Sequence, residues 1–280
     1  MSAEAARYAV VGDPVEHSAS PRLFAALGRH LGLALDYRAE RVSVAQLAEF
    51  LGRVRGGAYR GLSVTLPHKE AALRLADSAT DSARAVGAAN TLVVRDGGRL
   101  EADNTDGVGL VRALAAHGVS LLDSRVLVLG AGGAARAAVH AARGAGARAL
   151  FVSNRTAERA ERLAADLGAV AVPLQSQTLR PVLQDTDVLI QASAASLLRP
   201  TETVLPEGCV LHPHLTVLDM VYQPVETALL RAARAAGARC VDGLWMLVHQ
   251  ALEQLRLWTG AEADPSVAAA LHEELVRGLP

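Results

Sequence analysis

The chain contains 27 arginines and a single lysine, Lys69. An arginine keeps its proton at any working pH, whereas a lysine amine can be tuned to release and regain a proton. Lys69 lies in the polar run 63–70, Ser-Val-Thr-Leu-Pro-His-Lys-Glu. One lysine kept in so arginine-rich a chain indicates an acid–base role for its amine, although a chance survivor on a surface helix would give the same count.

Three further polar segments could bind a small ligand. Ser18 and Ser20 are separated by one residue, and the segments 87–91 (Gly-Ala-Ala-Asn-Thr) and 103–107 (Asp-Asn-Thr-Asp-Gly) are rich in uncharged hydrogen-bonding groups. Each segment alone is typical of a turn or a helix cap. Together with Lys69 they form a set of groups suited to a small polyhydroxylated molecule.

A glycine-rich segment, 130–135, reads Gly-Ala-Gly-Gly-Ala-Ala and fits the dinucleotide-binding pattern G-x-G-x-x-A. The first glycine permits a tight turn, the second lets backbone N–H groups approach a pyrophosphate, and the small last residue lets the helix lie close to the strand. The start of the helix then favours phosphate. A tight strand–helix turn without a ligand is the alternative interpretation.

The strand after this turn bears on the choice between NAD and NADP. An NAD site would place Asp or Glu at the end of that strand, to bind the ribose hydroxyls. Here the strand ends in Ser153-Asn154-Arg155-Thr156, and Arg159 follows one turn later. Two guanidinium groups and a hydroxyl suit the 2′-phosphate of NADP. An arginine pair on a solvated face is the alternative.

Strand-like and helix-like segments alternate through most of the chain, which predicts an α/β fold with parallel sheets. In the first half we expect strands at 8–11, 37–42 and 61–66, helices at 20–31 and 43–55, and a β-hairpin of 91–95 with 99–102. Ser20 is the predicted N-cap of its helix, with Pro21 at the first helical position.

In the second half, the apolar run 126–129 is typical of a strand buried on both faces. We expect a helix from Asp106 to about His117, and strands at 126–129, 150–153, 188–190 and 217–220. The predicted domains are a substrate-binding and catalytic domain (1–105), a Rossmann-type, doubly wound NADP-binding domain (106–242), and C-terminal helices (243–280) that pack back on the first domain.

Composition excludes several classes of protein. The net charge of −1 and pI near 6.8 give no electrostatic argument for binding nucleic acid or an anionic membrane. Cys209 and Cys240 are far from any metal-ligand spacing, so we expect no metal and no disulfide. No apolar run approaches the roughly 20 residues that a membrane helix needs. We therefore expect a soluble, cytoplasmic protein.

Over essentially its whole length the sequence resembles the shikimate dehydrogenase family. The resemblance rests on the order and spacing of eight motifs: S-x-S-P (18–21), V-T-L-P-H-K-E (64–70), G-A-x-N-T (87–91), D-N-T-D-G (103–107), G-A-G-G-A (130–134), N-R-T (154–156), D-x-x-Y-x-P-x-x-T (219–227) and D-G-x-x-M-L-x-x-Q-A (242–251). It implies a two-domain monomer or homodimer that uses NADPH to reduce 3-dehydroshikimate reversibly to shikimate in aromatic amino-acid biosynthesis.

The resemblance also implies a role for individual residues, carried over motif by motif. The implied catalytic pair is Lys69 and Asp106. The implied substrate-binding residues are Ser18, Ser20, Thr65, Asn90, Thr105, Tyr222 and Gln250. The implied cofactor-binding residues are Gly130, Ala131, Gly132, Gly133, Ala134, Asn154, Arg155, Thr156, Arg159 and Gly243.

The chain departs from the family pattern at three places. Residues 191–196, Gln-Ala-Ser-Ala-Ala-Ser, stand where the family often has N-A-T-x-x-G, Ser63 stands where Asn is frequent, and Trp245 stands where Gly is frequent. Two alternatives stay open. One is a quinate/shikimate dehydrogenase, which an acid at the ribose position would favour. The other is a catalytically silent NADP-binding regulator on the same scaffold.

Overall fold

The computed structural model describes residues 6–279 and divides into two compact units. Among the described residues, unit 1 consists of 6–105 together with Gln250–Gly278, and unit 2, apart from the end of the chain, consists of Asp106–His249. The chain therefore passes from one unit to the other twice. The second passage lies inside helix α11 (Gly243–Thr259), later than the boundary at 242 that the sequence suggested.

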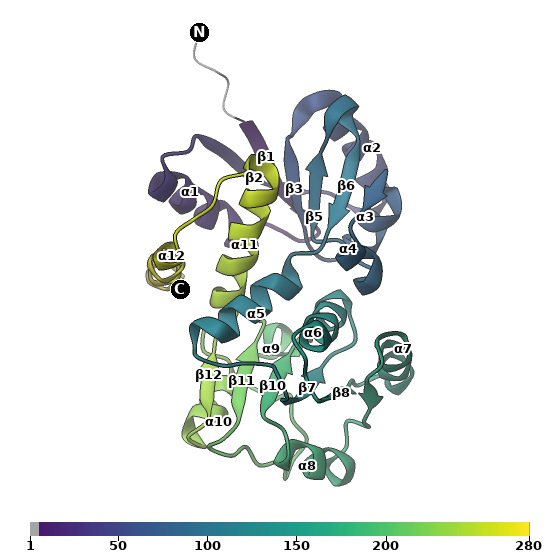
Figure 1. The fold of residues 1–280 in the computed structure, drawn as a ribbon, viewed down its shortest axis with the longest axis vertical. Helices are drawn as coiled ribbons and strands as arrows, with labels where there is room; N and C mark the ends of the chain where they lie inside the picture. The colour runs from purple at the N-terminus through teal and green to yellow at the C-terminus, as the bar shows by residue number, and fades with distance from the viewer. Residues whose placement is uncertain (1–5, 280) are drawn as a thin grey trace. The chain divides into compact units, whose positions relative to one another are not determined.

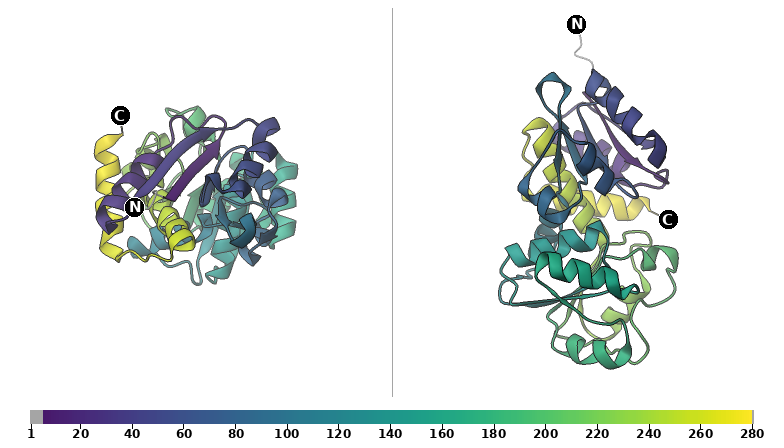
Figure 2. Two further views of the ribbon diagram at one scale, coloured as in Figure 1. Left: turned by 90° about the horizontal axis from the view of Figure 1, so that it is seen from above. Right: turned by 90° about the vertical axis from the view of Figure 1, so that its right-hand side faces the viewer.

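Unit 1 is built on a six-stranded mixed sheet with the order β2-β1-β3-β5-β6-β4. Its strands are β1 (Ala6–Gly12), β2 (Leu35–Arg41), β3 (Gly61–Val64), β4 (Ser78–Ala79), β5 (Thr91–Val94) and β6 (Leu100–Asp103). β1 pairs in parallel with β2 and β3, and Figure 2 shows β1 and β2 side by side in purple. The predicted hairpin is confirmed as β5–β6, and because β5 also runs antiparallel to β3, this sheet is not wholly parallel.

Helices cover the sheet of unit 1 (Figure 1). They are α1 (Ser20–Leu31), α2 (Leu47–Arg53), α3 (Lys69–Leu75), α4 (Asp81–Val86), the last part of α11, and α12 (Pro265–Gly278), which packs against α1. The prediction that Ser20 caps α1 is wrong: Ala19 is the N-cap, and the backbone N–H of Ser20 donates to Ser18 Oγ at 3.2 Å. A hydroxyl two residues earlier thus takes the role of the cap.

Aromatic residues make up only 3% of the chain, and four of them gather where α11 meets the sheet of unit 1. The Trp258 ring stacks on Tyr8 with 5.0 Å between centroids, and Phe24 stacks on Tyr37 at 4.0 Å. Trp258 Nε1 donates to the backbone oxygen of Leu92 at 3.1 Å. Large rings with one polar contact hold α11 firmly against the sheet.

Unit 2 has a six-stranded, wholly parallel sheet with the order β12-β11-β10-β7-β8-β9. Its strands are β7 (Arg125–Leu129), β8 (Ala149–Ser153), β9 (Val170–Ala171), β10 (Val188–Gln191), β11 (Thr216–Asp219) and β12 (Arg239–Val241). Counted along unit 2 alone, this order is 6-5-4-1-2-3, which is the doubly wound dinucleotide-binding topology. The predicted Rossmann-type fold is confirmed.

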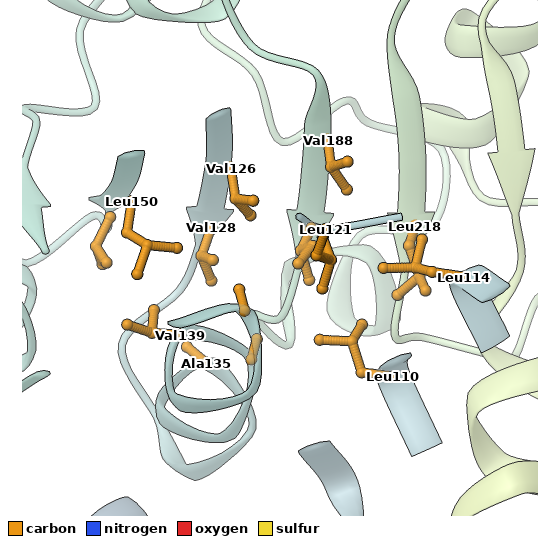
Figure 3. Close-up of a cluster of buried hydrophobic side chains, with 14 of the residues drawn as sticks. Leu110, Leu114, Leu121, Val126, Val128, Ala135, Val139, Leu150, Val188 and Leu218 are labelled. Carbon is orange, nitrogen blue, oxygen red and sulfur yellow. The ribbon is translucent and has the colours of Figure 1, made fainter. Parts of the chain in front are cut away.

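Helices pack on both faces of this sheet, as the continuous apolar strands predicted. They are α5 (Asp106–Ala116), α6 (Gly133–Gly144), α7 (Ala157–Leu167), α8 (Ser176–Gln184), α9 (Ala195–Leu198), α10 (Ala228–Ala235) and the start of α11. On one face, Val126 and Val128 of β7 lie against Ala135 and Val139 of α6 (Figure 3). The opposite face of the same strand packs its leucines against α8 and α10.

Candidate active site

Polar segments of unit 1 converge at one edge of its sheet. β1 and β3 are parallel neighbours, so the loops that follow them leave the sheet on the same side. β5 runs antiparallel to β3 and β6 antiparallel to β5, so β5 begins and β6 ends on that side too. This topology brings to one edge the sequence-predicted residues Ser18, Ser20, Thr65, Lys69, Asn90 and Thr105.

Asn90, Thr105 and Gln250 form the centre of this edge. All three are at most 8% exposed. Asn90 Nδ2 donates to Thr105 Oγ1 at 3.0 Å and to Gln250 Oε1 at 3.4 Å, while the Thr105 backbone N–H donates to Asn90 Oδ1 at 2.8 Å. Residues that are 160 positions apart in the sequence therefore meet in one hydrogen-bonded cluster.

Sequence reasoning missed a second layer of polar groups behind this cluster. Thr91 Oγ1 donates to Asn90 Oδ1 at 2.8 Å, and Gln254 Nε2 donates to Thr91 Oγ1 at 3.0 Å. Gln254 lies one helical turn after Gln250 on α11, and this i, i+4 spacing is the signal that could have found it. Ser63, noted only as a departure from the family pattern, donates to Gln254 Oε1 at 2.7 Å.

Lys69 is the first residue of α3 and is half-buried. Its backbone oxygen accepts a hydrogen bond from the N–H of Ala89 at 2.9 Å, which places the start of α3 beside Asn90. The preceding residue, His68, is fully buried, and its Nε2 lies 2.5 Å from the backbone oxygen of Val42. This contact anchors the turn that carries Lys69.

Asp106 directly follows Thr105, begins α5 and is 6% exposed. It is the first residue of unit 2, whereas Lys69 belongs to unit 1. Tyr222 also lies in unit 2, in the loop after β11, and is half-buried. The residues implied for catalysis and substrate binding are thus shared between the two units.

The glycine-rich turn of unit 2 has the backbone that a pyrophosphate requires. Gly130 has a φ of 126°, and a Cβ there would lie 3.0 Å from the backbone of Ala192 and Ser193. Gly132 is the N-cap of α6 without a side-chain cap, and a Cβ there would meet nothing within 4 Å. The start of a 12-residue helix thus faces open space with uncapped N–H groups, and this fits an anion.

The end of β8 has no carboxylate. Asn154 Nδ2 donates to the backbone oxygen of Thr156 at 2.9 Å, which shapes the turn. Arg155 and Arg159 are both exposed, and among residues 6–279 neither forms an ion pair with an Asp or Glu. Two guanidinium groups beside the dinucleotide turn fit a 2′-phosphate better than a bare ribose.

The segment 191–196, which departs from the family pattern, forms a closed hydrogen-bond network. Gln191 is fully buried, and its Nε2 donates to Ser196 Oγ at 3.1 Å while its Oε1 accepts from the Ser193 backbone N–H at 3.1 Å. Ser196 Oγ donates to Asp219 Oδ2 at 2.9 Å, and Thr227 Oγ1 donates to the same oxygen at 2.8 Å. Burial raises the pKa of the Asp219 carboxyl, against the lowering effect of these donors.

The start of α11 lies against the end of β11. A Cβ at Gly243 would lie 2.7 Å from the backbone oxygens of Met220 and Val221, so only glycine permits this approach. Trp245 packs within unit 2, edge-on to His117 with 4.9 Å between centroids and stacked on His249 at 6.2 Å. Burial, and then the positive charge of Arg112 and His117, lowers the pKa of His249 to about 4.

Residues 6–279 contain no cluster of three or more His, Cys, Asp or Glu that could hold a metal ion. Within the same range, none of the helices has the length and apolar character needed to cross a membrane.

The fold and the site together define a class: an oxidoreductase with a dinucleotide-binding unit and a separate unit for the substrate. Family models agree with this class over most of the chain. They match as the shikimate dehydrogenase substrate binding domain (residues 10–92), shikimate/quinate 5-dehydrogenase (113–210) and the shikimate 5′-dehydrogenase C-terminal domain (243–270). The chain belongs to the shikimate dehydrogenase family.

Curated relatives have similar length. The shikimate dehydrogenase (NADP(+)) of Methanosarcina acetivorans is 40% identical over 91% of this chain and 93% of its own. That of Aeromonas hydrophila is 41% identical over 91% and 92%.

Solved structures share the fold. Shikimate 5-dehydrogenase from Thermus thermophilus, in complex with NADP(H) and shikimate, has a TM-score of 0.88 at 39% identity and covers 96% of this chain and 99% of its own. The ligand-free 5-ketofructose reductase of a Gluconobacter strain has a TM-score of 0.85 at 31% identity and covers 97% and 99%.

Proposed function

We propose that this protein catalyses the reversible, NADPH-dependent reduction of 3-dehydroshikimate to shikimate, a step in the biosynthesis of aromatic amino acids. One observation carries the proposal. The only lysine of the chain begins a helix beside a buried cluster of hydroxyl and amide groups, in a member of a family whose curated relatives are NADP-dependent shikimate dehydrogenases.

The substrate is a small ring with several hydroxyls and one carboxylate. Neutral hydroxyl and amide groups bind the ring hydroxyls without burying a charge of the protein. In this proposal Ser18 and Ser20 bind the carboxylate, and the ring hydroxyls are bound by Thr65, Asn90, Thr105 and Gln250. Tyr222 assists from unit 2.

NADPH, when bound, supplies the hydride that reduces the ketone carbon. The ammonium of Lys69 donates a proton from Nζ to the ketone oxygen during reduction, and the amine takes the proton back during oxidation. In this proposal the Asp106 carboxylate orients that amine and the reacting hydroxyl.

The cofactor is held by the remaining predicted residues. Backbone N–H groups of the turn 130–134 (Gly130, Ala131, Gly132, Gly133 and Ala134) bind the pyrophosphate at the start of α6. Arg155 and Arg159, with Asn154 and Thr156, bind the 2′-phosphate. Gly243, whose lack of a side chain lets α11 approach β11, completes the cofactor-binding side of unit 2.

A second candidate is reduction of a polyhydroxylated ketone without a carboxylate. The likeness to 5-ketofructose reductase, at 31% identity and a TM-score of 0.85, favours it, because the same scaffold reduces such a ketone there. Turnover of the two substrates decides between the two functions, since the hydroxyls of Ser18 and Ser20 suit a carboxylate and a substrate hydroxyl alike.

Steady-state kinetics test the proposal. Oxidation of shikimate and of quinate is measured with NADP and with NAD, and reduction of 5-ketofructose is measured with NADPH. The highest kcat/KM is expected for shikimate with NADP. A higher value for 5-ketofructose would support the second candidate, and a higher value for quinate with NAD would support a quinate/shikimate dehydrogenase. NADP binding without turnover of any of these substrates would support a catalytically silent NADP-binding regulator.

Two further proposals concern the location of the protein in the cell and its oligomeric state. We propose a cytoplasmic enzyme, because its reaction consumes NADPH and its two cysteines do not form a disulfide. We also propose a monomer or homodimer, to be measured by light scattering coupled to size-exclusion chromatography.

A further inference from the structure

Four polar side chains form a continuous chain of hydrogen bonds through the interior of unit 1. The Tyr37 hydroxyl donates to Ser63 Oγ at 2.7 Å, and Ser63 Oγ donates to Gln254 Oε1 at 2.7 Å. Gln254 Nε2 then donates to Thr91 Oγ1 at 3.0 Å and to the backbone oxygen of Asn90 at 3.2 Å. The proposed chemistry uses none of these four side chains.

Two backbone groups of fixed polarity set the direction of the whole chain. The backbone oxygen of Asn90 can only accept, so the end of the Gln254 amide that faces it must be Nε2. The other end, Oε1, then requires the proton of Ser63. The Thr105 backbone N–H can only donate, so it fixes Asn90 Oδ1 on its side, 2.8 Å away. The orientation of each amide therefore follows from hydrogen-bond chemistry.

This fixed direction determines which hydrogen bonds the Asn90 side chain makes. Thr91 accepts from Gln254, so its single hydroxyl proton is directed to Asn90 Oδ1, 2.8 Å away. Asn90 Oδ1 thus accepts two short bonds of 2.8 Å, from Thr91 Oγ1 and the Thr105 N–H, beside a longer one of 3.3 Å from Thr105 Oγ1, and Asn90 Nδ2 is turned towards Thr105 Oγ1 and Gln250 Oε1. Without Gln254, the Thr91 proton could turn to other acceptors, and the Asn90 amide would lose one of the two short bonds that hold Oδ1 in place.

We infer that Gln254, assisted by Ser63, is a positioning residue for the substrate site: through Thr91 and the backbone of Asn90 it fixes the orientation in which the Asn90 amide meets the substrate. Gln254 is 1% exposed and Ser63 is 6% exposed, so both must be hydrogen-bonded to be tolerated there. The two fit each other in length. Ser63 is short and stands where the family often has Asn, and the longer Gln254 reaches from α11 to bridge β3 and β5.

This inference rests on the proposed role of Asn90 in substrate binding. Its first test distinguishes an effect on the orientation of the Asn90 side chain from an effect on the stability of the fold. In Gln254→Met the shape is kept and both donated bonds are lost. The KM for shikimate is expected to rise about tenfold, the effect of losing roughly one net hydrogen bond, with KM for NADP unchanged and kcat changed less than about twofold.

Trp258→Phe is the matched control. It also removes one hydrogen bond from α11 to β5, the 3.1 Å bond to the Leu92 backbone oxygen, but Trp258 does not contact Asn90 or Thr91 through any bond of this network. Its unfolding midpoint should fall while KM for shikimate stays within about twofold of wild type. An equal rise of KM in both variants would mean that Gln254 acts only through stability, and the inference would be wrong.

A conservative variant, Gln254→Glu, should make the KM for shikimate depend on pH, which a purely structural role of Gln254 would not do. A protonated carboxyl can accept from Ser63 and donate one of the two hydrogen bonds that the amide donates, to the Asn90 backbone oxygen or to Thr91, whereas a carboxylate can donate neither. Burial raises the pKa of a carboxyl. KM for shikimate should therefore be raised only about twofold to threefold over wild type at about pH 6, where one donated bond is kept, and about tenfold by about pH 9, where none is. A ratio to wild type that does not change with pH would overturn the inference.

A measurement without substrate distinguishes failure of the inference from failure of the proposed function. In ¹⁵N-labelled protein, the side-chain amide resonances of Asn90, assigned with an Asn90→Asp variant, should shift and exchange faster with solvent in Gln254→Met than in Trp258→Phe. This result is expected even if the wild-type protein does not turn over shikimate. Unchanged Asn90 resonances would overturn the positioning role whatever the substrate is.

Discussion

The choice between NADP and NAD is open to a direct test at Arg155. In Arg155→Ala the affinity for NADP should fall while that for NAD stays nearly the same, because only NADP carries the 2′-phosphate. A charge-assisted hydrogen bond contributes about 1.5–3 kcal/mol. Arg155 is exposed, so water and salt screen its charge, and the lower figure applies. The expected loss is about tenfold in the dissociation constant of NADP.

The assay is titration calorimetry with each cofactor, at low and at high salt. The loss caused by Arg155→Ala should shrink at high salt, since exposed charges are screened over about 10 Å at 0.1 M. Arg162→Ala is the control: Arg162 is an exposed arginine of α7, the helix that begins two residues after Arg155, and it donates to the Glu158 backbone oxygen at 3.3 Å. Equal losses for NADP and NAD, or an equal loss in Arg162→Ala, would refute the assignment of Arg155 to the phosphate.

Four other outcomes are expected. Lys69→Arg keeps the positive charge but not a transferable proton, because a guanidinium has a pKa above about 12. Turnover should therefore fall about 10²–10⁴-fold while the affinity for NADP is unchanged. Near-normal turnover across pH would contradict the acid–base role of Lys69. Ser18→Ala should raise KM for shikimate more than it lowers kcat, and unaltered kinetics would make that loop structural. Gly130→Ala should lower the free energy of unfolding by about 1–3 kcal/mol and weaken NADP binding, because φ is 126° there and the new Cβ would lie against the Ala192 backbone. Chemical denaturation measures the change in the free energy of unfolding. His249 has its pKa lowered from 6.5 to about 4, so the unfolded state binds a proton first and stability should fall as pH drops from 6.5 towards 4; His249→Leu should flatten that slope.

The architecture of unit 2 could be predicted from the sequence because its signals are local. A run such as 126–129 has apolar residues at every position, and this follows from the burial of both faces of a parallel strand. The glycine-rich turn is recognisable by its spacing alone. The hairpin 91–103 was found for the same reason, since its turn residues Asp96-Gly97-Gly98 lie between two short β-forming runs.

The parts that were missed depend on contacts that are remote in the chain. Gln254 bonds to Ser63, 191 positions earlier; its i, i+4 spacing from Gln250 marks its helix face, but no local pattern pairs it with Ser63. Ser20 was misassigned as a cap because a hydroxyl at the start of a helix is usually the acceptor, whereas here Ser18 accepts instead. The break between units inside α11 was also hidden, because helical periodicity continues across it.

The passage of the chain between units twice has a consequence for synthesis on the ribosome. All strands of unit 2 lie in one stretch, Asp106–His249, so they have all been synthesised before Gln250 is added. Unit 1 is discontinuous in sequence. The hydrogen bonds of Asn90 to Gln250 and Gln254 can form only after these two residues have been synthesised. Domains generally fold as units while synthesis proceeds. The nucleotide-binding unit is therefore expected to be complete on the nascent chain first, and the pocket for the substrate to be the last part of the protein to form.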